Sequence, residues 1–227
     1  LDPKFSLAHF YLGKIFLTVN LSADALPHLE TANKLRPSNT ETVILLAQAL
    51  CLEHDLDTAL PVIETPGFSS TEMAHIYREL GRKLRAAQQW QMALTVLQKA
   101  YVIDKNDEAT VTNLTETLER TNKLEEADEF ICSYLQRTSK PSMAINVLTT
   151  RIKRRLGKLD EARQFAQKAL ENADNTDASA SMYNEFGKIL DKQQNYTAAW
   201  DAFSKSNQIM KIQAKANNIS FDFAPGL

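Results

Sequence analysis

The sequence predicts an all-α protein, a solenoid of stacked antiparallel helix hairpins, and three observations support this prediction. A pair of marker residues recurs every 34 positions. Apolar residues follow the period of an amphipathic helix on both sides of a short polar turn. Small residues recur at one place in the first helix of each unit. Since one hairpin cannot cover its own apolar faces, neighbouring hairpins must stack.

The two markers are a leucine and, thirteen residues later, an alanine. The leucines are Leu12, Leu46, Leu80 and Leu114, and the alanines are Ala25, Ala59, Ala93 and Ala127. The step then lengthens to Ala162 and to Ala199, so one residue and then three are inserted near the fifth unit. The spacing predicts a single array over 1–227, with units at about 6–39, 40–73, 74–107, 108–141, 142–179 and 180–213, and a C-terminal extension at 214–227.

Individual units follow this scheme with two departures. In the first and third units, Gly13 and Gly81 follow the marker leucine, where the absence of a side chain lets two helices approach closely. In the second unit, Thr65-Pro66-Gly67 should end the second helix early. The fifth unit has Thr149 and Thr150 where a leucine and a small residue are expected, which predicts shortened or shifted packing.

The last two units have recognisable second helices. In the fifth, Asp160 and Glu161 fall in the first turn of the second helix, where negative charge is favoured by the helix dipole. In the sixth, the marker pair returns as Phe186 and Ala199, and the second helix is predicted to run on through Ala214.

The stretches "SLAHFYLGKIF" and "YNEFGKILDKQQNYTAAWDAFSKSNQIM" resemble the tetratricopeptide repeat, and the resemblance covers about 6–213. It implies a right-handed superhelix that binds a protein or peptide on a concave face lined by the first helices. Leu1-Asp2-Pro3 stands where Leu35-Arg36-Pro37 stands one period later, so we expect Leu1 to close a repeat that lies upstream.

The last 45 residues or so are also similar to the final repeat of bacterial proteins in which a tetratricopeptide region precedes a sulfotransferase domain. This weaker resemblance implies an alternative function, the substrate-recognition region of a sulfotransferase whose catalytic domain is absent from this chain. A strand, a phosphate-binding loop and a helix directly after Leu227 would favour that alternative.

The composition argues against several other classes of function. A net charge of -2 gives no sign of nucleic-acid binding, and no apolar run approaches the roughly 20 residues that cross a bilayer. Two distant cysteines, four scattered histidines and six glycines form no metal-ligand motif and no phosphate-binding loop. We therefore predict no catalytic residue, no metal and no cofactor. The absence of an initiator Met and of a leader fits a cytoplasmic protein and equally an excised fragment.

The resemblance implies that a partner contacts first-helix residues outside the core stripe. The predicted set is Phe10, Lys14, Ile44, Gln48, Arg78, Arg82, Arg85, Arg120, Arg151, Arg154, Arg155, Asn184 and Lys188. The set is apolar toward the N-terminus and rich in arginine from the third unit onward. At the apolar end, Leu7, Phe10 and Leu17 form either a docking groove or a surface left bare by a missing repeat. The exposed end at Leu7 and Phe10 keeps a self-associating array open as a third interpretation.

Two interpretations of the arginines remain open. Arg78, Arg82 and Arg85 lie at i, i+4 and i+7 on one side of a helix, where like charges repel, so a counter-charge is expected. Either carboxylates of the next unit, such as Glu116 and Glu119, supply it, or an acidic or phosphorylated peptide does so through bidentate contacts.

Overall fold

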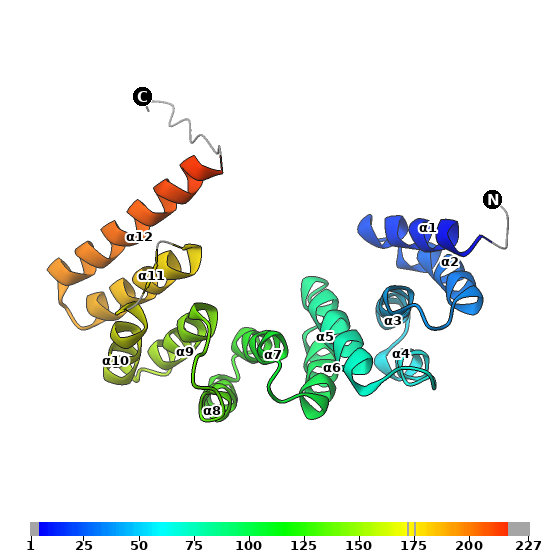
Figure 1. The fold of residues 1–227 in the computed structure, drawn as a ribbon, viewed down its shortest axis with the longest axis horizontal. Coiled ribbons are helices and arrows are strands. Elements are labelled where there is room, and N and C mark those ends of the chain that lie inside the picture. Colours follow the sequence, from blue (N-terminus) through cyan, green and yellow to red (C-terminus); the bar gives the residue numbers. More distant parts are fainter. Residues whose placement is uncertain (1–4, 172, 175, 218–227) are drawn as a thin grey trace. The chain divides into compact units, whose positions relative to one another are not determined.

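A computed structural model describes residues 5–171, 173–174 and 176–217. Within these residues the chain forms twelve α-helices and no β-strand (Figure 1). The helices fall into two compact units, Leu1–Thr121 and Asn122–Leu227. This confirms the all-α fold class. Leu1-Asp2-Pro3, the segment expected to close an upstream repeat, lies outside the described residues.

Neighbouring helices pack as hairpins inside each unit. The first unit contains α1 (Ser6–Thr18), α2 (Ser22–Leu35), α3 (Thr40–Glu53), α4 (Leu56–Ile63), α5 (Ser70–Ala86), α6 (Trp90–Ile103) and α7 (Glu108–Arg120). The second contains α8 (Leu124–Leu135), α9 (Met143–Arg155), α10 (Leu159–Leu170), α11 (Asp177–Lys192) and α12 (Tyr196–Ala216). First helices also contact the first helices of neighbouring hairpins, α1 with α3, α3 with α5, α5 with α7, and α9 with α11. The hairpins therefore stack in sequence order within each unit.

Polar side chains start the first helices. Five of the six described first helices have an N-cap side chain that accepts a hydrogen bond from the backbone N–H three residues on, and the caps are Asn39, Ser69, Asp107, Ser142 and Thr176. At Ser69 the arrangement is a full capping box, because the Glu72 carboxylate accepts a hydrogen bond from the Ser69 N–H. These caps fix where each hairpin begins.

Five of the six turns between a first and a second helix share one backbone conformation, and the turn between α3 and α4 is the exception. Two residues before the second helix, the backbone adopts positive φ at Asn20, Gln88, Asn122, Gly157 and Gln194. Only one of these five residues is glycine, so the sequence did not reveal this turn.

Small residues bring the two helices of a hairpin together as predicted. A Cβ at Gly81 would lie 2.5 Å from Leu97 Cγ, and a Cβ at Gly187 would lie 2.6 Å from the Phe203 ring. Carbon atoms prefer a separation of about 3.5–4.0 Å, so no larger residue fits without movement. The close approach of the helices therefore depends on glycine at these positions.

The two irregular repeats, the second (40–73) and the fifth (142–179), differ from each other. Helix α4 has 8 residues and ends at Ile63, just before Thr65-Pro66-Gly67, whereas the other second helices have 12 or more, so the predicted early end is confirmed. In the fifth repeat, α9 and α10 have ordinary lengths of 13 and 12 residues, so the expected shortening is absent. Thr149 and Thr150 are buried there, and the Thr149 hydroxyl donates to the Ile145 carbonyl at 2.8 Å.

Candidate partner-binding surface

In the first unit, α5 carries three arginines that meet carboxylates of the same unit. Arg78 Nη1 donates to Asp107 Oδ2 at 2.9 Å, and Arg82 Nε donates to Glu79 Oε2 at 3.0 Å. Burial alone would raise the pKa of Asp107, but the hydrogen bonds from Thr110 and Arg78 outweigh it and hold that pKa below its usual value. The ion pair with Arg78 therefore favours the charged form of Asp107.

Arg85 is the most enclosed of the three. Its guanidinium donates to Asn113 Oδ1 and to Glu116 Oε2, each at 2.5 Å. Glu116 is one of the two acids that the sequence suggested as internal partners. The like-charged row on α5 is thus balanced within the first unit, by Glu79 on its own helix and by residues at or after the start of α7.

The N-terminal members of the predicted set divide by burial. Phe10, Leu17 and Ile44 are buried in the core, so we correct their assignment: their side chains offer a partner almost no surface. Lys14 is exposed and donates to Glu41 Oε1 at 3.0 Å. Gln48 is half-buried on α3, and Arg120 is exposed at the end of α7.

In the second unit, an acid that the sequence analysis overlooked neutralises part of the predicted set. Glu185 on α11 is buried and accepts hydrogen bonds from Arg154 Nε at 2.8 Å and from Lys188 Nζ at 2.9 Å. Burial alone would raise the pKa of Glu185, but these hydrogen bonds outweigh it and lower the pKa. Arg155 is exposed and donates to Asn122 Oδ1 at 3.2 Å.

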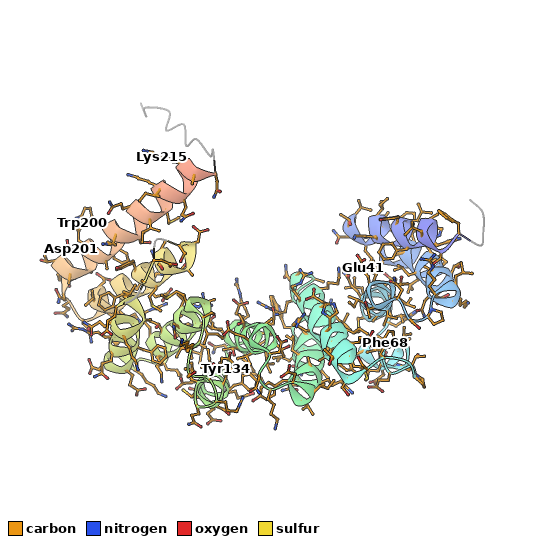
Figure 2. All side chains as sticks on the ribbon, in the orientation of Figure 1. Glu41, Phe68, Tyr134, Trp200, Asp201 and Lys215 are labelled. Atoms are coloured by element: carbon orange, nitrogen blue, oxygen red, sulfur yellow. The ribbon has the colours of Figure 1, made fainter. Side chains whose placement is uncertain are left out.

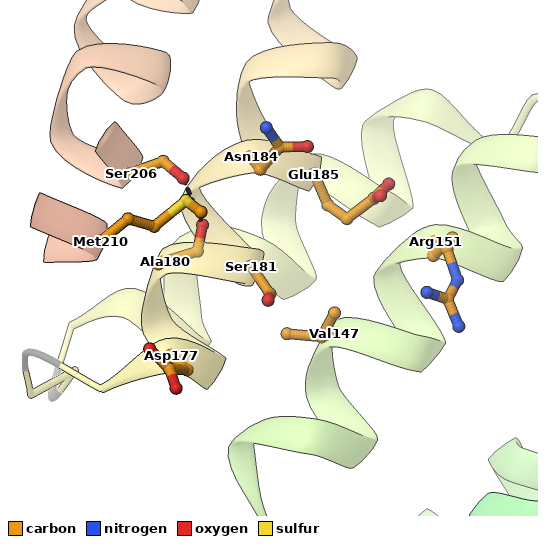
Figure 3. A pocket seen from close by; sticks show the side chains of 9 residues that line it. All are labelled: Val147, Arg151, Asp177, Ala180, Ser181, Asn184, Glu185, Ser206 and Met210. Atoms are coloured by element: carbon orange, nitrogen blue, oxygen red, sulfur yellow. Dashed lines mark hydrogen bonds between the residues drawn. The ribbon is translucent and has the colours of Figure 1, made fainter. Parts of the chain in front are cut away.

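A pocket of about 420 Å³ lies between α9, α11 and α12 in the second unit (Figure 3). The pocket is lined by Val147, Arg151, Asp177, Ala180, Ser181, Asn184, Glu185, Ser206 and Met210. Two of these, Arg151 and Asn184, belong to the set predicted from the sequence. Ser206 Oγ donates to the Ala180 carbonyl at 2.8 Å and ties α12 to α11 beside the pocket. Helix α12 has 21 residues, whereas the other second helices have 14 or fewer, and its fifteenth residue is Met210.

The lining combines an apolar wall with polar groups at different ends. Val147, Ala180 and Met210 give the apolar wall, and Figure 3 shows Arg151 on the side of the pocket opposite Met210 and Asp177. Ligand pockets are commonly about 300–1,000 Å³ with a few placed polar groups. The arrangement can hold one or two side chains of an extended segment. Among the described residues no group of three or more His, Cys, Asp or Glu side chains is placed to hold a metal ion.

No helix in the described part of the chain is both long enough and apolar enough to span a bilayer.

Comparisons with known proteins support the fold. No protein-family description and no curated protein matches the chain. Among solved structures, BtubC from P. vanneervenii is 14% identical with a TM-score of 0.59, over 92% of this chain and 94% of that one. Residues 41-end of MamA from Desulfovibrio magneticus RS-1 are 12% identical with a TM-score of 0.56, over 94% and 98%.

The Cut9 complex with Hcn1 from the APC/C is similar in the same way. It is 16% identical with a TM-score of 0.55, and the match covers 96% of this chain but 42% of that one, so this chain spans less than half its length. Cut9 and MamA are tetratricopeptide-type proteins. At these identities the likeness shows the fold, which is that of a tetratricopeptide-type helical solenoid. None of these comparisons supports the sulfotransferase resemblance, which stays a prediction.

Proposed function

We propose that this chain is a non-catalytic scaffold that binds an extended protein segment across the first helices of the second unit. The observation that carries the proposal is the pocket between α9, α11 and α12, because it lies where two side chains predicted to contact a partner, Arg151 and Asn184, come together. Its volume suits a side chain of the bound segment.

The charges around the pocket favour a particular kind of segment. Carboxylates pair well with a guanidinium, so an acidic side chain is favoured at the end near Arg151. Asp177 disfavours a second acid at the other end, and Met210 and Val147 offer contact to an aliphatic side chain there. The expected segment therefore carries one acid followed or preceded by an aliphatic residue, which is more specific than a run of acids.

We prefer the pocket to the arginine row of the first unit because the pocket offers a cavity for a side chain of the bound segment. Arg78 and Arg85 already engage carboxylates at 2.9 and 2.5 Å, and a peptide would have to displace those partners. Such an exchange gives little net free energy, because one charged contact replaces another.

A peptide array of fixed length and randomised sequence, probed with the chain, tests the proposal. Bound peptides should contain one acid beside an aliphatic residue, and their affinity should fall as salt rises. Ser181→Trp, which fills the pocket, should weaken binding by at least tenfold. Ser204→Trp, at an exposed position on α12 outside the pocket lining, is the matched control and should leave affinity unchanged. Equal binding by wild type and Ser181→Trp would contradict the proposal.

A further inference from the structure

Two repeats of the chain contain the same pair of a tyrosine and a lysine. In the third repeat, Tyr77 lies nine residues before the end of α5, and Lys99 is the tenth residue of α6. In the sixth repeat, Tyr183 and Lys205 occupy the same places in α11 and α12. The lysine nitrogen lies 5.7 Å from the ring centroid of the tyrosine in the first pair and 5.9 Å in the second. The two pairs therefore have the same geometry.

In the third repeat, an acid from the preceding repeat joins the pair. Glu64, the residue directly after α4, accepts hydrogen bonds at Oε1 from the Tyr77 hydroxyl at 2.8 Å and from Lys99 Nζ at 3.0 Å. These two hydrogen bonds, first that from Tyr77, hold the pKa of Glu64 below its usual value. The tyrosine and the lysine are thus two converging donors that bind a carboxylate.

The sixth repeat has no acid in this place. Glu64 is the ninth residue counted from the start of α4, and the ninth residue of α10 is Gln167. Within the described part of the chain, neither the Tyr183 hydroxyl nor Lys205 Nζ has a hydrogen bond or an ion pair. The two donors that bind a carboxylate in the third repeat are therefore without an acceptor in the sixth.

A pocket of about 450 Å³ lies beside these donors, between α10, α11 and α12. Tyr183, Gln167 and Lys205 all line it, and Arg163 of α10 adds a second cation. Asp201, in the N-terminal half of α12 (Figure 2), is the one acid among the described residues of the lining, so cations outnumber acids there. The pocket thus favours a negatively charged group.

This pocket is distinct from the one between α9, α11 and α12. The two share no lining residue, because α11 contributes Ser181 and Asn184 to that pocket and Tyr183 and Phe186 to this one. A ligand bound here leaves Arg151 and its surroundings unoccupied.

We propose that the pocket between α10, α11 and α12 binds a glutamate side chain of a partner protein, with its carboxylate in the place that Glu64 takes in the third repeat. The Tyr183 hydroxyl and Lys205 Nζ donate to that carboxylate, and Phe186 offers apolar contact to the methylene groups of the glutamate. The pocket is larger than one carboxylate side chain requires, so it also has room for a neighbouring residue of the partner.

A blocked tripeptide, leucine–glutamate–leucine, is the probe, and NMR of the backbone amides of Tyr183, Ala198 and Lys205 follows its binding. The tripeptide should shift these amides, and its glutamine analogue should bind at least tenfold more weakly, because it lacks the charge. Lys205→Met should weaken binding of the tripeptide at least tenfold. Lys211→Met removes the same charge from an exposed position of α12 outside the pocket, and it should change the affinity less than twofold.

Gln167→Glu tests the comparison of the two repeats directly, because it supplies the acid from within the chain. The new carboxylate should engage Tyr183 and Lys205 as Glu64 engages its partners, and the tripeptide should then bind at least tenfold more weakly. Gln164→Glu, at an exposed position of α10 outside the pocket, adds the same charge and should leave binding unchanged. Circular dichroism checks that the variants are folded.

Three results would overturn the proposal. The first is equal binding of the glutamate and glutamine tripeptides, and the second is an equal effect of Gln167→Glu and Gln164→Glu. The third is displacement of the tripeptide by an equal concentration of free glutamate or inorganic phosphate, because the ligand would then not be a protein side chain. Ser181→Trp should leave binding at these amides unchanged, which separates this site from the pocket of the proposed function.

Discussion

Gly81→Ala should destabilise the first unit, although alanine is normally the better helix residue. The added Cβ would lie 2.5 Å from Leu97 Cγ and 2.7 Å from Leu97 Cδ2, about 1 Å closer than carbon atoms prefer. Leu97 is fully buried and has no solvent to move into. Overpacking of this kind costs about 1–3 kcal/mol, while the gain in helix propensity returns about 1 kcal/mol. The net loss should be about 1–2 kcal/mol.

Urea unfolding followed by circular dichroism measures this loss. Leu97→Ala alone should cost about 2–5 kcal/mol, and the double variant should cost at least about 1 kcal/mol less than the sum, because the new methyl group enters the vacated space. Ala47→Gly, at the equivalent buried position of α3, should lose only the ordinary propensity of about 1 kcal/mol. If Gly81→Ala stabilises the chain, the close approach of α5 and α6 does not depend on the glycine.

Two further predictions concern the second unit. Burial would raise the pKa of Glu185, but its hydrogen bonds outweigh burial and lower the pKa. Its contribution to stability is therefore full above the unfolded pKa of about 4.3 and is lost as pH falls through the lower folded pKa. The urea midpoint should change more between pH 7 and pH 3 for wild type than for Glu185→Gln, and equal changes would contradict the role of this carboxylate. Gly157 has φ +77° with no atom within 4 Å of an added Cβ, so Gly157→Ala should cost about 1 kcal/mol from backbone strain alone; an unchanged melting temperature would refute this.

The fold could be predicted from the sequence because the residues that define the repeat spacing are the same residues that pack the two helices of a hairpin together. The marker leucine and alanine recur where the two helices of a hairpin meet, and Leu80 and Ala93 are both buried there. The early end of α4 was predictable because proline removes a backbone donor. The turn conformation was not, since Gln88 and Gln194 adopt positive φ without the glycine that normally signals it.

In the fifth repeat, a departure from the pattern on the first helix is compensated by a residue on the second helix. Thr150 occupies the position that holds Gly81 and Gly187 in other repeats. Because threonine is larger than glycine, the sequence predicted disturbed packing there. The residue of α10 that corresponds to Leu97 and Phe203 is Ala166, so the added volume on the first helix coincides with lost volume on the second. The sum of the two residues, and not either alone, decides how close the helices can come.

The binding surface was only partly predictable, because the charge that a first helix presents depends on its neighbours. Arg78 and Arg85 looked like an exposed cationic row in the sequence, yet each meets an acid located at or beyond the start of α7, about 30 residues further on. Glu185 neutralises Arg154 in the same way from the next first helix. In stacked hairpins, part of the counter-charge for the first helix of one repeat thus comes from acids in the next repeat. Summing the charges along one helix leaves these acids out. The binding specificity that we propose therefore rests on the pocket between α9, α11 and α12, to which the long α12 adds Met210.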